Sequence, residues 1–248
     1  MPRAGSPLRG PPSDHGKRSY VREMFTAIAP RYDLLNHALS LNMDWLWRRS
    51  AVRKLGWEAA PQGAYLDLCA GTLDLAAELA RRPGFGGSVV GADFVVPMLQ
   101  HGRRKASSVY PVAADALSLP FANGSFDGCT VAFGIRNLAD VNAGLTEMAR
   151  VLKPGGRLVV LEFSIPLTWP LRPLYLFYFY FRTILPVIGR TVSKHMTAYS
   201  YLPDSVERFP DNEGFAALMQ EGGFTHVGVE RLTSGVASLY WGEVGDHR

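Results

Sequence analysis

The spacing of hydrophobic and polar residues changes near residue 56. Between residues 18 and 55 the apolar positions recur with a helical period, and Gly56 is a natural end to this region. Beyond it, short apolar runs with the composition of strands alternate with segments of helical composition. The strands predicted in this region are Ala64–Cys69, Ser88–Ala92, Val109–Ala113, Gly128–Phe133 and Arg157–Phe163.

This alternation predicts βαβ units. Right-handed crossovers between parallel strands place helices on both faces of a twisted open sheet. Near the C-terminus we expect a helix at Glu213–Glu221 and two last strands, Thr225–Arg231 and Val236–Trp241, joined through Gly235. The predicted fold is therefore α/β and Rossmann-like, with a mostly parallel seven-stranded sheet and an antiparallel hairpin at its C-terminal edge.

The chain is long enough for one sizeable domain with additions. Its 248 residues are too few for two large α/β cores. Residues 1–17 are rich in Pro, Gly and Ser and lack the apolar stretch of a secretory signal, so we expect a disordered tail there. The domain then spans residues 18–248, with a helical cap over 18–56 and an aromatic lid insertion over 165–197. Prolines and arginines make this insertion a poor membrane-spanning helix.

Composition adds three expectations. An excess of 26 Lys and Arg over 22 Asp and Glu gives a formal charge of +4, which mildly favours nucleic acid or anionic lipid surfaces. Cys69 and Cys129 each lie in an apolar run, which favours buried reduced thiols and a cytoplasmic location. No histidine stands at ligand spacing from another histidine or a cysteine, so we predict no metal site.

The first predicted strand leads into a turn with a single glycine, running from Asp67 through Gly71 to Asp74. Gly71 lets a ligand approach the backbone closely, and the free N–H groups of the following helix suit a carboxylate or a phosphate. Taken alone, an ordinary strand–helix turn explains this segment equally well.

The next two strand ends also carry acidic residues. Asp93 lies about twenty residues beyond Gly71 and can accept both hydroxyls of a ribose, or it can cap the helix that contains Pro97. Asp115 can accept from an adenine amino group while Ala116 and its apolar neighbours cover the ring, or it can cap a turn. Three such positions at successive strand ends favour one adenosine-shaped site.

The cofactor that suits this site best is S-adenosylmethionine. A redox dinucleotide is disfavoured because the sequence G-x-G-x-x-G is absent. S-adenosylmethionine carries no phosphate and so needs fewer glycines.

The chain resembles the C-methyltransferases of menaquinone and ubiquinone biosynthesis, a family of class I methyltransferases, from about Tyr20 to Trp241. The matching residues fall into four stretches. They are Tyr32-Asp33-Leu34-Leu35-Asn36 with Ser40 and Trp47, Phe133-Gly134-Ile135-Arg136-Asn137, Arg150-Val151-Leu152-Lys153-Pro154-Gly155-Gly156-Arg157 through Glu162-Phe163-Ser164, and Tyr199-Ser200-Tyr201-Leu202-Pro203.

The resemblance has departures. Ala70 and Leu73 stand in the turn where family members more often have glycine, Asp44 stands where His is common, and Ala132 replaces a Ser that some relatives use. Because a leucine adopts helical dihedrals without strain, we expect the turn to survive with altered contacts.

The resemblance implies roles for individual residues. Cofactor contacts fall on Thr72, Asp93, Asp115 and Ala116, and Asp67 and Asp74 are candidates for holding the methionine ammonium. Arg136 is the catalytic candidate, stabilising a phenolate or polarising a water, with an ion pair to Asp140 as the plainer alternative. Tyr32, Asn36 and Tyr199 are candidates for the quinol side, although polar aromatic residues in lids are often simple packing.

The implied reaction is methylation of a ring carbon of a prenylated quinol, with demethylmenaquinol preferred over the ubiquinone precursor. Loss of a hydroxyl proton makes that carbon nucleophilic, and catalysis needs alignment with the methyl group and removal of the proton. Alternatives are another small hydrophobic acceptor and a non-catalytic scaffold of a quinone-making assembly. We expect no nucleic acid, a possible homo-oligomer, and peripheral contact with the inner membrane surface through the aromatic insertion, unless that insertion is only a packed cap.

Overall fold

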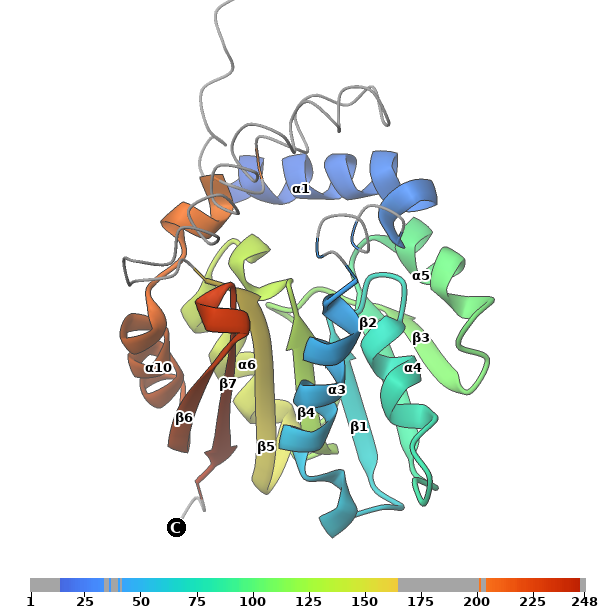
Figure 1. Ribbon diagram of the computed structural model, residues 1–248, viewed down its shortest axis with the longest axis vertical. Coiled ribbons are helices and arrows are strands. Elements are labelled where there is room, and N and C mark those ends of the chain that lie inside the picture. The colour runs from blue at the N-terminus through green and yellow to red at the C-terminus, as the bar shows by residue number, and fades with distance from the viewer. Residues whose placement is uncertain are drawn as a thin grey trace, which may run out of the picture.

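A seven-stranded sheet forms the centre of the protein. The computed structural model describes residues 14–33, 36, 40, 42–164, 201 and 204–245. Within these residues the strands lie in the order β3-β2-β1-β4-β5-β7-β6 (Figure 1). Strands β1 to β5 are parallel, whereas β7 is antiparallel to both β5 and β6. Their bounds are β1 Ala64–Leu68, β2 Ser88–Asp93, β3 Val109–Ala113, β4 Phe126–Ala132, β5 Leu152–Phe163, β6 Phe224–Leu232 and β7 Ala237–Val244.

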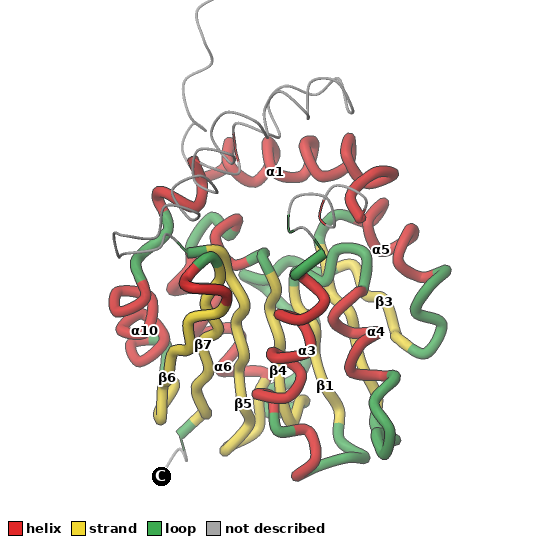
Figure 2. The backbone as a smooth tube through the Cα atoms, viewed as in Figure 1, coloured by secondary structure: helices red, strands yellow, loops and turns green. Residues whose placement is uncertain are grey.

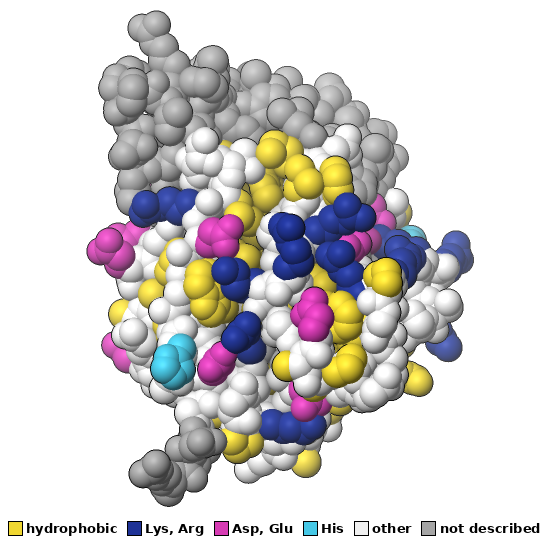
Figure 3. All heavy atoms as spheres, turned by 60° about the horizontal axis from the view of Figure 1, so that its bottom comes forward, with side chains coloured by type: hydrophobic (Ala, Val, Ile, Leu, Met, Phe, Trp, Pro, Cys, Tyr) yellow, Lys and Arg dark blue, Asp and Glu magenta, His cyan; other side chains and the backbone are white. Residues whose placement is uncertain are grey.

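Helices cover both faces of this sheet. One face carries α3 (Asp44–Leu55), α4 (Asp74–Ala80) and α5 (Val96–Arg103), and the other carries α6 (Val141–Val151) and α10 (Asn212–Glu221). Helix α1 (Asp14–Ile28) crosses above the carboxyl ends of the parallel strands (Figure 2). On the face that includes α3, lysine and arginine side chains gather beside hydrophobic ones (Figure 3). Short 3-10 turns occupy Ala29–Arg31, Trp57–Ala59, Ile135–Asn137 and Thr233–Gly235.

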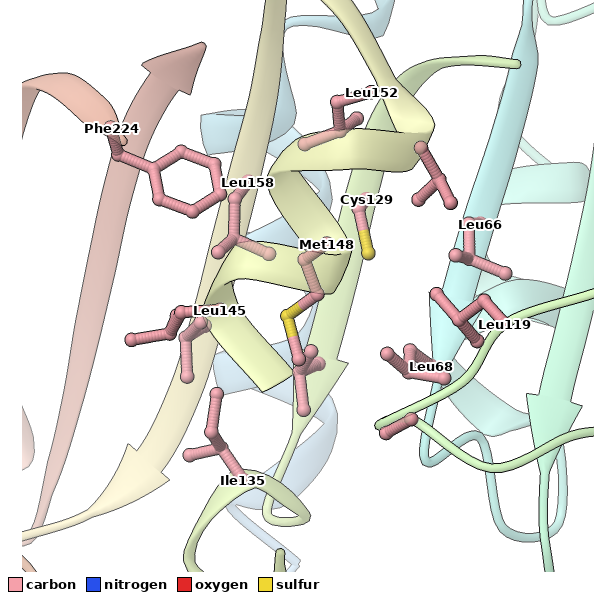
Figure 4. Close-up of a cluster of buried hydrophobic side chains, with 14 of the residues drawn as sticks. Leu66, Leu68, Leu119, Cys129, Ile135, Leu145, Met148, Leu152, Leu158 and Phe224 are labelled. Atoms are coloured by element: carbon pink, nitrogen blue, oxygen red, sulfur yellow. The ribbon is translucent and has the colours of Figure 1, made fainter. Parts of the chain in front are cut away.

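The alternation of side chains along β5 explains why both faces are covered. Leu158 and Val160 point into the core beneath α6 and α10, and Val159 and Leu161 point into the core beneath α3 and α4. Figure 4 shows the first of these cores, where Met148 of α6 packs among side chains of the central strands. A strand that is apolar on both faces is stable only when both faces are buried.

The predicted architecture is confirmed, including the mostly parallel seven-stranded sheet and its antiparallel edge. The main difference lies in β5, which begins at Leu152 instead of the predicted Arg157. The intervening residues 153–156 contain one proline and two glycines. The structure accommodates them by a shift in register, because Phe126 pairs with Leu152 and Gly128 with Arg157.

The predicted tail over residues 1–17 is wrong for residues 14–17, which belong to α1. The Lys17 ammonium donates to the backbone carbonyls of Arg136 at 3.2 Å and Leu138 at 2.5 Å, and this anchors the first turn of the helix above the sheet. The predicted lid insertion, residues 165–197, lies outside the described residues.

The turn between β1 and α4 departs from expectation at Leu73. This residue does not adopt helical dihedrals, because its φ is 64° and its ψ is 22°, in the left-handed region. Its side chain is fully buried, and a Cβ atom placed on Gly91 or on Gly102 would lie 2.3 Å from its Cδ2 or 2.8 Å from its Cγ. Packing in the space that these two glycines leave therefore compensates a backbone conformation that costs a leucine about 1–2 kcal/mol.

At Leu73 the glycine variant should be more stable than the alanine variant, the reverse of the order usual within a helix. We expect Leu73→Ala to lower the free energy of unfolding by about 3 kcal/mol through the cavity it leaves. Leu73→Gly should cost about 1 kcal/mol less than Leu73→Ala, since glycine adopts a positive φ freely and caps helices better than alanine. Urea unfolding measures both variants.

The matched control is Leu79, which is buried in the last turn of the same helix and has no positive φ. There the glycine variant should be the less stable one by about 1 kcal/mol. A glycine variant at Leu73 that is less stable than the alanine variant would contradict the interpretation.

Candidate functional site

Two adjoining cavities lie at the carboxyl ends of the parallel strands, beneath α1. The first holds about 440 Å³ of empty space, part of it open to solvent, and includes Tyr32, Gly71 and Phe133 in its lining. The second holds about 410 Å³, also partly open, and includes Asp115 and Ala116. Both share one boundary, formed by Cys69, Asp93, Phe94, Asn137 and Leu138. This is the edge of an open α/β sheet at which ligands bind.

Asp93 borders both cavities and joins two strand ends. Its Oδ2 accepts from the N–H of Gly71 at 2.9 Å, and its Oδ1 accepts from the N–H of Val95 at 2.8 Å. Burial raises the pKa of this carboxyl, and the backbone donors oppose that shift. The plainer interpretation, a cap on the helix that contains Pro97, is wrong, because the N-cap of α5 is Val95 and no side chain caps this helix; Asp93 instead bonds the loop before α5 and stands at the wall of the site.

Asp115 and Ala116 line the second cavity, as the sequence predicted for an adenine site. The Asp115 Oδ1 accepts from the N–H of Leu117 at 3.1 Å, and Oδ2 pairs with the guanidinium of Arg18. Because Arg18 belongs to α1 and lines the same cavity, the helix reaches down to the carboxylate that was expected to meet the cofactor.

The other acidic and hydroxyl candidates lie behind the turn and are absent from the linings of these two cavities. The Asp67 carboxylate accepts from the Thr130 hydroxyl at 2.8 Å and from the N–H of Ala76 at 3.0 Å. Thr72 donates to Asp33 at 2.5 Å, and Asp74 pairs with Lys105 at 2.5 Å. Direct cofactor contacts by Asp67, Thr72 and Asp74 stay predictions.

On the expected acceptor side, Tyr32 lines the first cavity and is hydrogen-bonded to Asn36. Burial raises the pKa of the Tyr32 phenol, while the Asn36 hydrogen bond and the charges of Arg48 and Arg136 lower it. The structure thus brings Tyr32 and Asn36 together beside the site. Tyr199 lies outside the described residues.

Arg136 is buried and pairs with Glu162, so the expected pairing with Asp140 is wrong. Its Nη1 donates to Glu162 at 2.5 Å and to the carbonyl of Phe133 at 2.6 Å, and its Nε donates to Ser205 at 3.2 Å. Asp140 instead caps α6 by accepting from the N–H of Ala143 at 3.0 Å. The Glu162 pairing follows from the fold. Arg136 comes shortly after the end of β4, Glu162 is the next-to-last residue of β5, and the two strands are neighbours.

Asn137 is a site residue that the sequence analysis did not single out. It borders both cavities, and its buried Oδ1 has no hydrogen-bond partner among the described residues. An unpaired buried acceptor is costly, so a ligand donor at this boundary would stabilise it. Its place in the family-like stretch beside Arg136 was the available signal.

Cys69 also borders both cavities, but it is a poor nucleophile. It is a free thiol, as is Cys129, and burial raises its pKa well above the usual range. The thiol therefore stays protonated at neutral pH, and its contribution is to the shape of the wall.

These residues fit S-adenosylmethionine. The second cavity offers a carboxylate beside apolar side chains, which suits an adenine ring, and Asp93 with the unpaired Asn137 oxygen lies where the two cavities meet. The first cavity is mostly apolar, with Phe25, Met98 and Phe133 in its lining, and suits a hydrophobic ring.

Comparisons with known proteins agree with this geometry. The model of the ubiE/COQ5 methyltransferase family matches residues 14–244. The "Demethylmenaquinone methyltransferase" of Thermus thermophilus is 51% identical over 225 residues, covering 89% of this chain and 99% of that protein. The "Ubiquinone/menaquinone biosynthesis C-methyltransferase UbiE" of Geotalea daltonii is 47% identical over 233 residues, covering 92% and 97%.

Among solved structures, a Thermotoga maritima protein described as a SAM-dependent methyltransferase, possible histamine N-methyltransferase, has the same fold. The TM-score is 0.61 at 19% identity, with 89% of this chain and 99% of that chain covered. At this identity the likeness concerns the fold alone.

Asp67 should make stability depend on pH. Burial raises its pKa to about 7, against partial compensation by the Thr130 and Ala76 hydrogen bonds. An unfolded aspartate titrates near 3.9, so between about pH 4 and 7 the folded state holds a proton that the unfolded chain releases. Stability should fall as pH rises through this window, by up to about 4 kcal/mol, and level off above it.

Urea unfolding from pH 5 to 8 measures this slope. Asp67→Asn should flatten it, whereas Asp140→Asn, at an exposed helix cap, should leave it in place. An equal slope in the wild-type protein and Asp67→Asn would show that another group is responsible.

Proposed function

The chain belongs to the ubiE/COQ5 methyltransferase family, and we propose from this premise that it methylates a ring carbon of a prenylated demethylmenaquinol. The observation that carries the proposal is the meeting of two cavities at Asp93 and Asn137, one suited to adenosine and one to a hydrophobic ring. S-adenosylmethionine, when bound, supplies an electrophilic methyl group on its sulfonium.

The protein's part is to hold the two reactants in register. Asp115 and Ala116 would receive the adenine, Asp93 the ribose, and the backbone at Gly71 the methionine portion. The acceptor ring would lie in the first cavity against Tyr32. Orientation of this kind supplies a large part of the rate of a bimolecular transfer.

Arg136 is suited to stabilise negative charge on the acceptor. A ring carbon becomes nucleophilic when the adjacent hydroxyl loses its proton, and a fixed positive charge favours the resulting phenolate. The field of Arg136 reaches this region, because it lowers the pKa of the Tyr32 phenol. Glu162 and Ser205 occupy Nη1 and Nε, while Nη2 donates to no described group. Arg136 lines neither cavity, so in this proposal it acts at a distance, through the part of its charge that Glu162 does not neutralise, and the proton acceptor is a separate group.

Incubating the purified protein with labelled S-adenosylmethionine and each quinol precursor tests the proposal. We expect the label on the demethylmenaquinol, at a rate well above that on the precursor of the ubiquinone branch. Faster transfer to the ubiquinone precursor would assign the enzyme to ubiquinone biosynthesis instead. Cofactor binding without transfer to either precursor would favour a different hydrophobic acceptor, and no binding at all would favour a scaffold.

The same assay tests Arg136. Removing Arg136 alone would leave Glu162 charged and buried, at a cost of about 3–5 kcal/mol in stability, so the variant of choice is Arg136→Gln with Glu162→Gln. Transfer should fall at least about 100-fold while calorimetric affinity for the cofactor stays within about threefold. Full turnover in this variant would remove Arg136 from the mechanism.

We also propose peripheral contact with a membrane, through the start of α3. Among the residues that the structure describes, no helix combines the length and apolar character needed to cross a bilayer. Trp45 and Leu46 are nevertheless 47% and 45% exposed, and the Arg49 guanidinium lies over the Trp45 ring, 5.0 Å from its centre. Aromatic and apolar side chains beside basic ones suit an anionic lipid surface.

Co-sedimentation with phosphatidylglycerol vesicles tests this contact. Trp45→Ser with Leu46→Ser should lower the partition coefficient of the protein onto the vesicles roughly 10-fold, because apolar area is lost. Added salt should weaken binding further. The control is Tyr110→Ser, since Tyr110 is 64% exposed on β3 and should not contribute. Equal binding of the wild-type protein and the double variant would exclude this surface.

A further inference from the structure

Asp33 connects the acceptor side of the site to the turn after β1. Its Oδ1 accepts from the Thr72 hydroxyl at 2.5 Å, and its Oδ2 accepts from the Lys105 ammonium at 2.6 Å. Thr72 is almost fully buried, whereas Asp33 is partly exposed, so this hydrogen bond is only partly shielded from water. Two segments that are far apart in the sequence are thus joined by one side chain.

Lys105 extends the connection to the first residue of α4. The same ammonium that binds Asp33 lies 2.5 Å from the carboxylate of Asp74. On the other side of Asp74, the Arg48 guanidinium lies 3.6 Å away. Lys105 therefore bridges two carboxylates from segments that approach each other across the turn.

The residues next to Asp33 and Thr72 lie side by side in the lining of the first cavity. Tyr32 precedes Asp33, Gly71 precedes Thr72, and both line that cavity. A Cβ atom placed on Gly71 would lie 3.7 Å from Cε1 of the Tyr32 ring, so the ring stands against the backbone at Gly71. The Asp33–Thr72 hydrogen bond consequently sets the separation of the acceptor wall from the cofactor wall.

We propose that Asp33 and Lys105 are positioning residues, which align the acceptor ring with the cofactor during methyl transfer. The inference rests on the proposed function above, because it assigns the two walls to the two reactants. Neither side chain lines either of the two cavities described above, so both act through Tyr32 and Thr72. Methyl transfer requires alignment in line, and small displacements of a reactant lower its rate steeply.

Their exposure argues that alignment, more than stability, depends on this pair. The side chains of Lys105 and Asp33 are 33% and 40% exposed. Ion pairs in such positions contribute little to the free energy of folding. Removing the pair should therefore leave a folded protein whose two walls are no longer held in register.

Asp33→Asn and Lys105→Met test the inference with the full chain. We expect kcat to fall about 10- to 100-fold in each, with the calorimetric Kd for S-adenosylmethionine changed less than threefold. The double variant should be no slower than the slower single variant, because the two residues act as one unit. Lys54→Met is the matched control. Lys54 of α3 is a partly exposed lysine paired with Glu230 of β6, and its variant should retain the wild-type kcat.

Three outcomes would overturn the inference. They are an unchanged kcat in both single variants, a loss that resides wholly in the Kd for the cofactor, and full additivity in the double variant. Thermal unfolding of each variant separates these results from misfolding. Because the wild-type protein is assayed first on the quinol, failure of the proposed function would appear there and is distinct from failure of this inference.

Discussion

The site depends on one buried carboxylate, that of Asp93, which holds the ends of β1 and β2 in a fixed relation. By accepting from Gly71 and Val95 it ties the turn after β1 to the start of α5. Parallel pairing brings the strands side by side, but it leaves the loops beyond them free to diverge. With both carboxylate oxygens bonded to backbone N–H groups, the loops converge instead, and the two cavities open on either side of the same side chain.

The fold and part of the site could be predicted from the sequence. Apolar runs such as Ala64–Leu68 are buried on a two-sided sheet and are recognisable by composition, and strand ends mark the ligand edge, which identified Gly71, Asp93 and Asp115. The dihedrals of Leu73 were not predictable, because distant glycines that receive its side chain determine them. The partner of Arg136 was missed because it depends on which strands are neighbours, and sequence proximity pointed to Asp140 instead.

The basic side chains at the carboxyl ends of the strands each form ion pairs or hydrogen bonds that join separate segments of the chain. Lys17 and Arg18 fix α1 to the loops after β4 and β3, while Lys105 and Arg48 join the turn to the segments on its other side. The small net charge of +4 gives no hint of this arrangement. The consequence is a site whose walls come from several separate parts of the chain and are held together by side chains.

The room that Gly91 and Gly102 leave for Leu73 constrains the order in which this turn can change by mutation. A leucine at position 73 fits only after positions 91 and 102 have both lost their side chains, since a Cβ atom at either would overlap it. While Leu73 remains, Gly91 cannot gain even a methyl group, although a smaller residue at position 73 would remove the 2.3 Å contact; Gly102 stays a glycine in either case, because a Cβ atom there would also lie 2.5 Å from the backbone of Thr72. Positions 73 and 91 are therefore epistatic, and the packing makes the leucine a substitution that must be reversed before position 91 can vary.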